Sequence, residues 1–174
     1  MAAAVVLPPK LQLPGVNDSK KLTAPRRSEC YDEIVRLCIA WAPGVVTPEE
    51  IDRSGMTASV RLAFFRAASG LPIQPELFLV DGLPVRGLQL NAEYVVKGDS
   101  KSLSIASASI LAKVTRDEIM IRAHHEYPGY DFISNKGYGT RKHLEALRVL
   151  GPTPIHRMSF APLRDDGQMR LNLD

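Results

Sequence analysis

The sequence predicts an α/β domain in which short strands alternate with helices. Two apolar runs, residues 2–7 and 77–80, have the composition of buried strands, and helical patterns lie between them. The chain has 174 residues, of which 45% are hydrophobic and 24% charged, values typical of one folded domain with its own core. Alternating strands and helices favour a layered architecture, with helices packed against a sheet.

The chain begins with the apolar strand at residues 2–7 and continues into a helix. Because the first residues of a domain tend to fray, a strand this close to the start leads us to expect that something upstream is missing. A helix is predicted after Thr23, an N-cap residue that is followed by Pro25 in the first turn. Its core-facing stripe is expected to consist of Tyr31, Ile34, Val35 and Cys38.

A second helix is predicted to start at Thr47, because Pro48 and Glu50 complete a proline-led capping box. We expect a weak point in this helix at Ser54 and Gly55. The residues expected to face inward are Ile51, Ala58, Leu62 and Phe65.

The second half of the chain is predicted to contain two strands and two longer helices. The strands are expected at 77–80 and 92–96, and the helices at 102–124 and 140–150. From Tyr127 onward, glycine, proline, aromatic and basic residues are mixed around the last of these helices.

Composition excludes several classes of protein. No apolar run approaches the ~20 residues needed to span a bilayer, and the apolar start lacks the charged segment of a secretory signal. Cys30 and Cys38 lie within one predicted helix, which fits reduced thiols better than a disulfide or a metal site. The net charge of +3 permits an anionic partner without demonstrating one.

Two aspartates are the candidates for chemistry. Asp81 directly follows the strand at 77–80, and the carboxyl ends of strands are where α/β sheets form their sites. Asp117 lies about 20° from Ala106 and Ile110 around its helix, so it points with the core-facing residues, where a carboxylate needs a cation or a partner. Two converging aspartates suggest a hard divalent cation. The alternatives are a turn aspartate at the first position and a salt bridge at the second.

Three further segments carry side chains suited to an anionic ligand. Between residues 10 and 27, five basic residues accompany the single acid Asp18, which fits either a phosphate-contacting patch or a solvated loop. Segment 97–102 lacks the spacing of a P-loop, although its backbone N–H groups could still meet an anion at a helix start. Tyr138 lies between two glycines, free to stack on a sugar or base or to pack on the surface.

Taken together, these segments resemble ribonuclease HII. The resemblance covers nearly the whole chain in order, and its longest and most specific part is residues 96–117. The other matching segments are 17–22, 80–82, 127–130, 136–140 and 156–160. The resemblance implies the ribonuclease H-like fold, a mixed sheet flanked by helices with a helical C-terminal part. It also implies a single domain over residues 1–174, with residues 127–174 as the substrate-binding part.

The resemblance also implies a function. Members of the family cut the RNA strand of RNA–DNA hybrids, including single ribonucleotides embedded in DNA, with two Mg²⁺ or Mn²⁺ ions held by four carboxylates. Asp81 and Asp117 would be two of these catalytic metal ligands, and Tyr138 would pack on a deoxyribose. The residues expected to contact nucleic acid are Lys20, Lys21, Lys97, Gly98, Ser100, Lys136 and Tyr138. We also expect a monomer with no membrane partner, and the two reduced thiols lead us to expect a cytoplasmic protein.

The chain departs from the family at its start. Family members begin with a strand that carries an Asp-Glu pair and a Gly-Arg-Gly turn, whereas residues 1–7 match the second family strand, so the first strand is missing. Two aspartates without that pair are not expected to hold two close cations. We therefore expect this chain to be impaired or inactive as a nuclease, and the alternative is a catalytically dead nucleic-acid-binding module. Asn135 is a further departure, at a position where histidine is common in the family.

Overall fold

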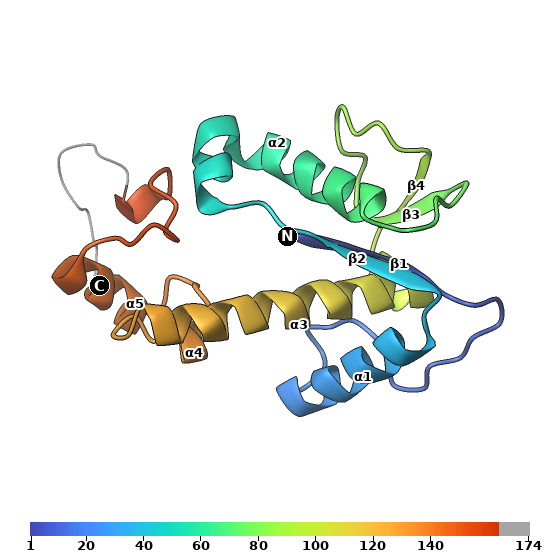
Figure 1. The fold of residues 1–174 in the computed structure, drawn as a ribbon, viewed down its shortest axis with the longest axis horizontal. Helices are drawn as coiled ribbons and strands as arrows, with labels where there is room; N and C mark the ends of the chain where they lie inside the picture. The colour runs from blue at the N-terminus through green and yellow to red at the C-terminus, as the bar shows by residue number, and fades with distance from the viewer. Residues whose placement is uncertain (164–174) are drawn as a thin grey trace. The chain divides into compact units, whose positions relative to one another are not determined.

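The computed structural model describes residues 1–163 and confirms the α/β class (Figure 1). In chain order the elements are β1 (Ala2–Val6), α1 (Ala24–Leu37), β2 (Ala40–Gly44), α2 (Pro48–Ser69), β3 (Phe78–Asp81), β4 (Ala92–Val95), the 3-10 turn η1 (Gly98–Ser100), α3 (Leu103–Glu126), α4 (Phe132–Asn135), α5 (Arg141–Leu150) and η2 (Ala161–Leu163). The predicted strands and helices are present with bounds shifted by at most a few residues, and β2 and α4 are additional to them.

The described chain divides into two compact units. Unit 1 comprises Met1–Val46 and Thr57–Thr115, and unit 2 comprises Thr47–Met56 together with the described chain from Arg116 onward. Helices α2 and α3 each contribute residues to both units. Among residues 1–163, no helix combines the length and the apolarity that crossing a bilayer requires.

The strands of unit 1 pair in two separate two-stranded sheets. β1 runs antiparallel to β2, from the pair Ala2 and Gly44 to the pair Val6 and Ala40. β3 runs parallel to β4 and ends with Asp81 opposite Val95. Both kinds of pairing that a mixed sheet contains are therefore present, divided between two small sheets. The β2 strand was hidden in the sequence because it contains Pro43 and Gly44, residues that are depleted in strands.

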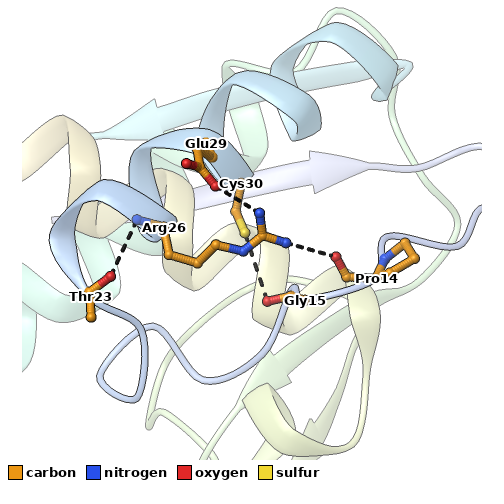
Figure 2. Close-up of polar contacts among 6 residues, drawn as sticks. All are labelled: Pro14, Gly15, Thr23, Arg26, Glu29 and Cys30. Carbon is orange, nitrogen blue, oxygen red and sulfur yellow. Dashed lines mark hydrogen bonds and ion pairs between the residues drawn. The ribbon is translucent and has the colours of Figure 1, made fainter.

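Helix α1 begins where Thr23 predicts, and it fixes the loop that precedes it (Figure 2). The Arg26 guanidinium binds the Glu29 carboxylate at 2.8 Å and donates to the Pro14 carbonyl oxygen at 3.2 Å. A side chain at Gly15 would collide with the same guanidinium, and the φ of +94° at this position also favours glycine. The loop is thereby held against the first turns of the helix.

The core of unit 1 contains Leu13, Cys30, Ile34, Ile110 and Leu111, contributed by the loop, α1 and α3. The predicted inward stripe of α1 is correct at Ile34 but wrong at Val35, which is 38% exposed. Cys30 takes the inward place instead, because positions 30 and 34 are one turn apart on the face toward α3. Both cysteines are free, as predicted.

Helix α2 starts with the predicted capping box, since Thr47 and Glu50 exchange hydrogen bonds of 2.9 and 3.2 Å. The weak point at Gly55 is confirmed as a kink with a φ of +78°. Phe65, expected to face inward, is half exposed. The buried face of α2 is built from small residues instead. Gly44 of β2 lies so close to this helix that a Cβ there would collide with the Ala63 carbonyl oxygen. Such a close approach of strand and helix leaves no space for an aromatic ring.

Unit 2 has a small aromatic core of its own. Tyr130 and Phe132 stack with ring centroids 5.4 Å apart, and the rings of His143 and His156 lie against them. From the first turns of α2, the Asp52 carboxylate accepts hydrogen bonds from the backbone N–H groups of residues 158 and 159, at 2.7 and 3.0 Å.

Candidate metal and nucleic-acid site

Asp81 is held at the end of β3 by the loop that follows the neighbouring strand. Because β3 and β4 are parallel and Asp81 lies opposite Val95, the chain leaving β4 passes directly beside the carboxylate. The backbone N–H of Gly98 donates to the Asp81 Oδ1 at 2.7 Å. A Cβ at residue 98 would lie 2.5 Å from the Ile105 Cδ1 and 3.2 Å from the Asp81 Oδ1. Only glycine therefore allows this approach without displacement of its neighbours.

The loop between β4 and α3 turns tightly around Gly98. Lys97 has left-handed backbone angles, with φ 56° and ψ 44°, and its carbonyl oxygen accepts a hydrogen bond from the Ser100 hydroxyl at 2.9 Å. The N–H groups of residues 100, 101 and 102 all donate to carbonyl oxygens within the loop. The expectation that these N–H groups meet an anion is therefore not supported. The side chains of Lys97 and Ser100 in this loop are exposed.

The loop that carries Lys20 and Lys21 is anchored on the long helix of the same unit. The buried Ser19 hydroxyl lies 2.8 Å from the Ser109 hydroxyl of α3. The Arg27 guanidinium donates to the Ser19 and Leu22 carbonyl oxygens, each at 2.9 Å. Ser19 thus anchors this loop, and the side chains of Lys20 and Lys21 that follow it are exposed.

Asp18, the only acid of this basic segment, shapes the loop that presents the lysines. Its Oδ1 accepts from the Lys20 N–H at 3.0 Å, and its carbonyl oxygen accepts from the Lys21 N–H at 3.0 Å. These bonds close a tight turn of the kind that aspartate favours. Within unit 1, the structure therefore places two rigid turns with exposed lysines, at residues 20–21 and at residue 97.

Asp117 lies on α3, as the helical pattern predicts. Ala106 and Ile110, its neighbours around the helix, are 2% and 0% exposed, and Asp117 itself is half-buried. Asp81 belongs to unit 1 and Asp117 to unit 2, so their convergence stays a prediction. Within residues 1–163, no three side chains of histidine, cysteine, aspartate or glutamate form a group that could hold a metal ion.

Tyr138 is presented by a loop that is fixed from inside unit 2. The buried Asn135 side chain donates to the Tyr130 carbonyl oxygen at 2.7 Å and accepts from the Gly137 N–H at 2.7 Å. The Tyr138 ring is 58% exposed, and the Arg116 guanidinium carbon lies 4.9 Å from its centroid. Lys136, also expected at the interface, donates from its ammonium group to the backbone of α4.

Sequence reasoning missed the parts played by Asn135 and Arg116 in this loop. In the sequence Asn135 stands out only as a departure from the family pattern, although an amide that can donate and accept at once is suited to closing a turn. Arg116 lies one residue before Asp117, and this position on α3 is the only sequence feature that could have pointed to its contact with Tyr138. A guanidinium over a tyrosine ring is a stabilising contact.

The two histidines of the aromatic core are neutral near pH 7. Burial, together with the neighbouring His143, lowers the pKa of His156 to about 4. Burial also lowers the pKa of His143. The Nδ1 of His156 accepts a hydrogen bond from the Thr153 N–H at 3.0 Å, which requires an unprotonated nitrogen. This pair belongs to the packing of unit 2.

The comparison with known proteins decides the family. The family model for ribonuclease HII matches residues 1–163, which is the whole of the described chain. The chain belongs to the ribonuclease HII family. The ribonuclease HII of Desulfitobacterium hafniense (strain Y51) is 46% identical over 164 residues, covering 94% of this chain and 63% of that protein. The ribonuclease HII of Carboxydothermus hydrogenoformans is 44% identical over 172 residues, covering 98% and 74%. The chain thus spans less than two thirds of the Desulfitobacterium ribonuclease HII.

Solved structures support the same fold. The ribonuclease H2 of Pyrococcus horikoshii OT3 matches with a TM-score of 0.72 and 27% identity, covering 86% of this chain and 79% of that one. The chain also resembles, at lower identity, the ribonuclease HII in a complex with PCNA from Archaeoglobus fulgidus, with a TM-score of 0.69 and 24% identity over 84% of this chain and 78% of that one. An RNase HIII in complex with Mn²⁺ matches with a TM-score of 0.55 and 19% identity, covering 86% and 56%. The last two likenesses concern the ribonuclease H-like fold alone.

Proposed function

We propose that this protein is an endonuclease that hydrolyses the RNA strand of RNA–DNA hybrids, including single ribonucleotides embedded in DNA. Membership of the ribonuclease HII family supports the reaction class. The observation that carries the proposal is the Asp81 carboxylate, fixed at the end of β3 by the Gly98 N–H and flanked by the exposed Lys97. A carboxylate fixed by the same turn that carries an exposed lysine is suited to a site that receives both a metal ion and a phosphate.

The lysines and Tyr138 are proposed to bind the nucleic acid. Lys20 and Lys21 project from a turn whose backbone is fixed by Asp18, so little backbone entropy is lost when they meet phosphates. Tyr138 is exposed and its ring is contacted by Arg116, which suits stacking on a sugar or base. An RNA–DNA hybrid presents phosphates and sugars together, so both kinds of contact serve one ligand.

Mg²⁺ or Mn²⁺ is the proposed cofactor, and the described residues fit it only in part. The Asp81 Oδ2 has no hydrogen-bond partner within residues 1–163, which leaves one oxygen for a cation. The same residues gather no group of three ligands, however, and two close cations need bridging carboxylates to offset their repulsion. We therefore propose that the 174-residue chain, with Asp81 and Asp117 as its metal ligands, holds a cation weakly and cleaves slowly or not at all.

The second candidate is a nucleic-acid-binding module of the same fold without catalysis. Two observations favour it. The described residues contain no complete group of metal ligands. The loops that carry the lysines and Tyr138 are nevertheless well ordered by their own contacts. One observation separates the two functions: the endonuclease cleaves its substrate when a divalent cation is present, and the binding module does not.

A labelled DNA duplex that contains one ribonucleotide tests both. Slow cleavage in Mn²⁺ or Mg²⁺ that disappears in Asp81→Asn supports the endonuclease. The matched control is Asp32→Asn, which makes the same change of charge on the exposed surface of α1. Salt-sensitive binding without any cleavage supports the module, and cleavage that survives in Asp81→Asn removes Asp81 from the site.

A further inference from the structure

Helix α1 carries an arginine that binds the backbone on both sides of the two exposed lysines. The Arg27 Nε donates to the Ser19 carbonyl oxygen and its Nη2 donates to the Leu22 carbonyl oxygen, each at 2.9 Å. Lys20 and Lys21 lie between these two acceptors in the sequence, and both are exposed. A single guanidinium of unit 1 therefore reaches both ends of the turn that presents the lysines.

The neighbouring Arg26 binds other parts of the chain (Figure 2). Its guanidinium binds the Glu29 carboxylate at 2.8 Å and the Pro14 carbonyl oxygen at 3.2 Å, so its partners lie on α1 and before the turn at residues 18–22. Arg26 is exposed, whereas Arg27 is half-buried. Because the two arginines have the same charge and adjacent positions, a comparison between them isolates the bonds to the turn.

The side chains at the two ends of the turn are anchored in unit 1. The buried Ser19 hydroxyl lies 2.8 Å from the Ser109 hydroxyl of α3, and Leu22 packs against the hydrophobic core. These anchors leave open how the peptide groups between them are oriented. Arg27 sets this orientation at both ends, because a carbonyl oxygen must point at its donor to accept a hydrogen bond.

The chemistry of arginine suits it to this role better than that of lysine. Both bonds are charge-assisted, so they are stronger than bonds between neutral groups. A guanidinium is planar and its donors have fixed directions, whereas an ammonium group is a point charge on a flexible stem. Lysine at position 27 would therefore keep the charge and lose the rigid connection between the two carbonyl oxygens.

We propose that Arg27 is a positioning residue of the nucleic-acid site, which holds the turn so that Lys20 and Lys21 meet the phosphates of a hybrid together. The inference rests on the proposed function, because the ligand is the RNA–DNA hybrid. A lysine on a fixed backbone loses only side-chain freedom when it binds a phosphate, whereas a lysine on a mobile loop also loses backbone freedom. Arg27 acts through the lysines and touches no phosphate itself.

Direct phosphate contact by Arg27 is the competing role, and support of the fold alone is another. Positioning is favoured over direct contact because two of the three guanidinium nitrogens already donate to carbonyl oxygens and the side chain is half-buried. The roles differ in their dependence on the lysines. A positioning residue has no effect on binding once the groups that it positions are removed.

The test compares Arg27→Lys with Arg26→Lys in the whole 174-residue chain. Binding of a labelled RNA–DNA hybrid is measured at several salt concentrations in EDTA, which prevents metal-dependent cleavage. In Arg27→Lys the affinity is expected to fall about tenfold, and the slope of log affinity against log salt is expected to fall by about 1–2, the share of one or two phosphate contacts. Arg26→Lys is expected to bind like the wild type.

A second background separates positioning from the competing roles. In a chain that carries Lys20→Ala and Lys21→Ala, adding Arg27→Lys is expected to change the affinity by less than about twofold. A loss of about tenfold in that background would assign Arg27 to direct contact or to the fold, and would overturn the proposal. Equal binding by Arg27→Lys and the wild type would also overturn it.

Trypsin measures the order of the turn without nucleic acid. Cleavage after Lys20 and Lys21 is expected to be at least about tenfold slower in the wild type than in a synthetic peptide of residues 14–26, which lacks Arg27. Cleavage is expected to be faster in Arg27→Lys and unchanged in Arg26→Lys. Equal rates in the wild-type chain and the peptide would overturn the proposal, even if Arg27→Lys does not fold.

The outcomes distinguish this inference from the proposed function. A wild-type chain that binds no hybrid would overturn both. Intact binding by the wild type, together with intact binding by Arg27→Lys, would overturn the positioning role alone.

Discussion

Replacing Gly98 with alanine is expected to destabilise unit 1 and to displace the Asp81 carboxylate. Gly98 is buried and does not have a positive φ, so its backbone accepts alanine and the effect is steric. The added Cβ would lie 2.5 Å from the Ile105 Cδ1 and 3.2 Å from the Asp81 Oδ1. Ile105 is itself 5% exposed, so the added methyl group has to displace a buried side chain.

The magnitude follows from the chemistry of overpacking. One extra methyl group in a well-packed interior costs about 1–3 kcal/mol of unfolding free energy. Ile105→Val removes the Cδ1 that causes the closest contact, and alone it costs about 0.5–1.5 kcal/mol. In the double variant the added and removed carbons compensate, so the combined loss is expected to be smaller than the sum by about 1 kcal/mol.

Urea unfolding followed by Trp41 fluorescence is the assay. Trp41 is the single tryptophan of the chain and lies in β2, so its signal reports on unit 1. Gly139→Ala is the matched control, because its Cβ would meet no atom closer than 3.8 Å, and circular dichroism should show a change of less than about 0.5 kcal/mol. A Gly98→Ala variant as stable as the wild type, or strict additivity with Ile105→Val, would refute the steric argument.

Three other changes test the proposed interface and the core of unit 2. Replacing Lys20 and Lys21 together with alanine should lower the slope of log affinity against log salt for a hybrid duplex by about 2, and an unchanged slope would remove them from the phosphate contacts. Tyr138→Ala should weaken hybrid binding by about 1–3 kcal/mol, whereas Tyr138→Phe should bind normally, so equal losses would argue against stacking. The pKa of His156 is lowered to about 4 from an unfolded value near 6.5, so the unfolded state binds more protons between these values. Stability should therefore fall as the pH drops from about 6.5 to 4, by about 1–2 kcal/mol after allowance for partial exposure, and this fall should be reduced in His156→Gln.

Much of the fold follows from local patterns that the sequence shows directly. Thr23 and Thr47 start helices because a hydroxyl that caps free N–H groups is a local feature, independent of tertiary packing. The apolar run before Asp81 forms a strand, as expected for a short continuous apolar segment flanked by Pro75 and Gly82.

The errors arise where distant parts of the chain meet. Phe65 was assigned inward from periodicity alone, but the tight approach of Gly44 to α2 admits only small residues there. The strand containing Pro43 was missed because its pairing with β1 is a long-range contact that no local signal announces. In the candidate site, Asp81 was predicted from its place in the chain, whereas the dependence of its position on Gly98 follows only from the register of β3 and β4.

Binding of Mn²⁺, followed by the loss of the free-ion EPR signal, tests most directly whether Asp81 is the carboxylate on which this protein's chemistry depends. Asparagine at this position can still accept the Gly98 N–H, so Asp81→Asn keeps the local fold and removes only the charge. The account predicts Mn²⁺ affinity at least tenfold weaker in Asp81→Asn, about 1.4 kcal/mol, and unchanged in Asp32→Asn. Equal affinity in the wild type and Asp81→Asn would contradict it.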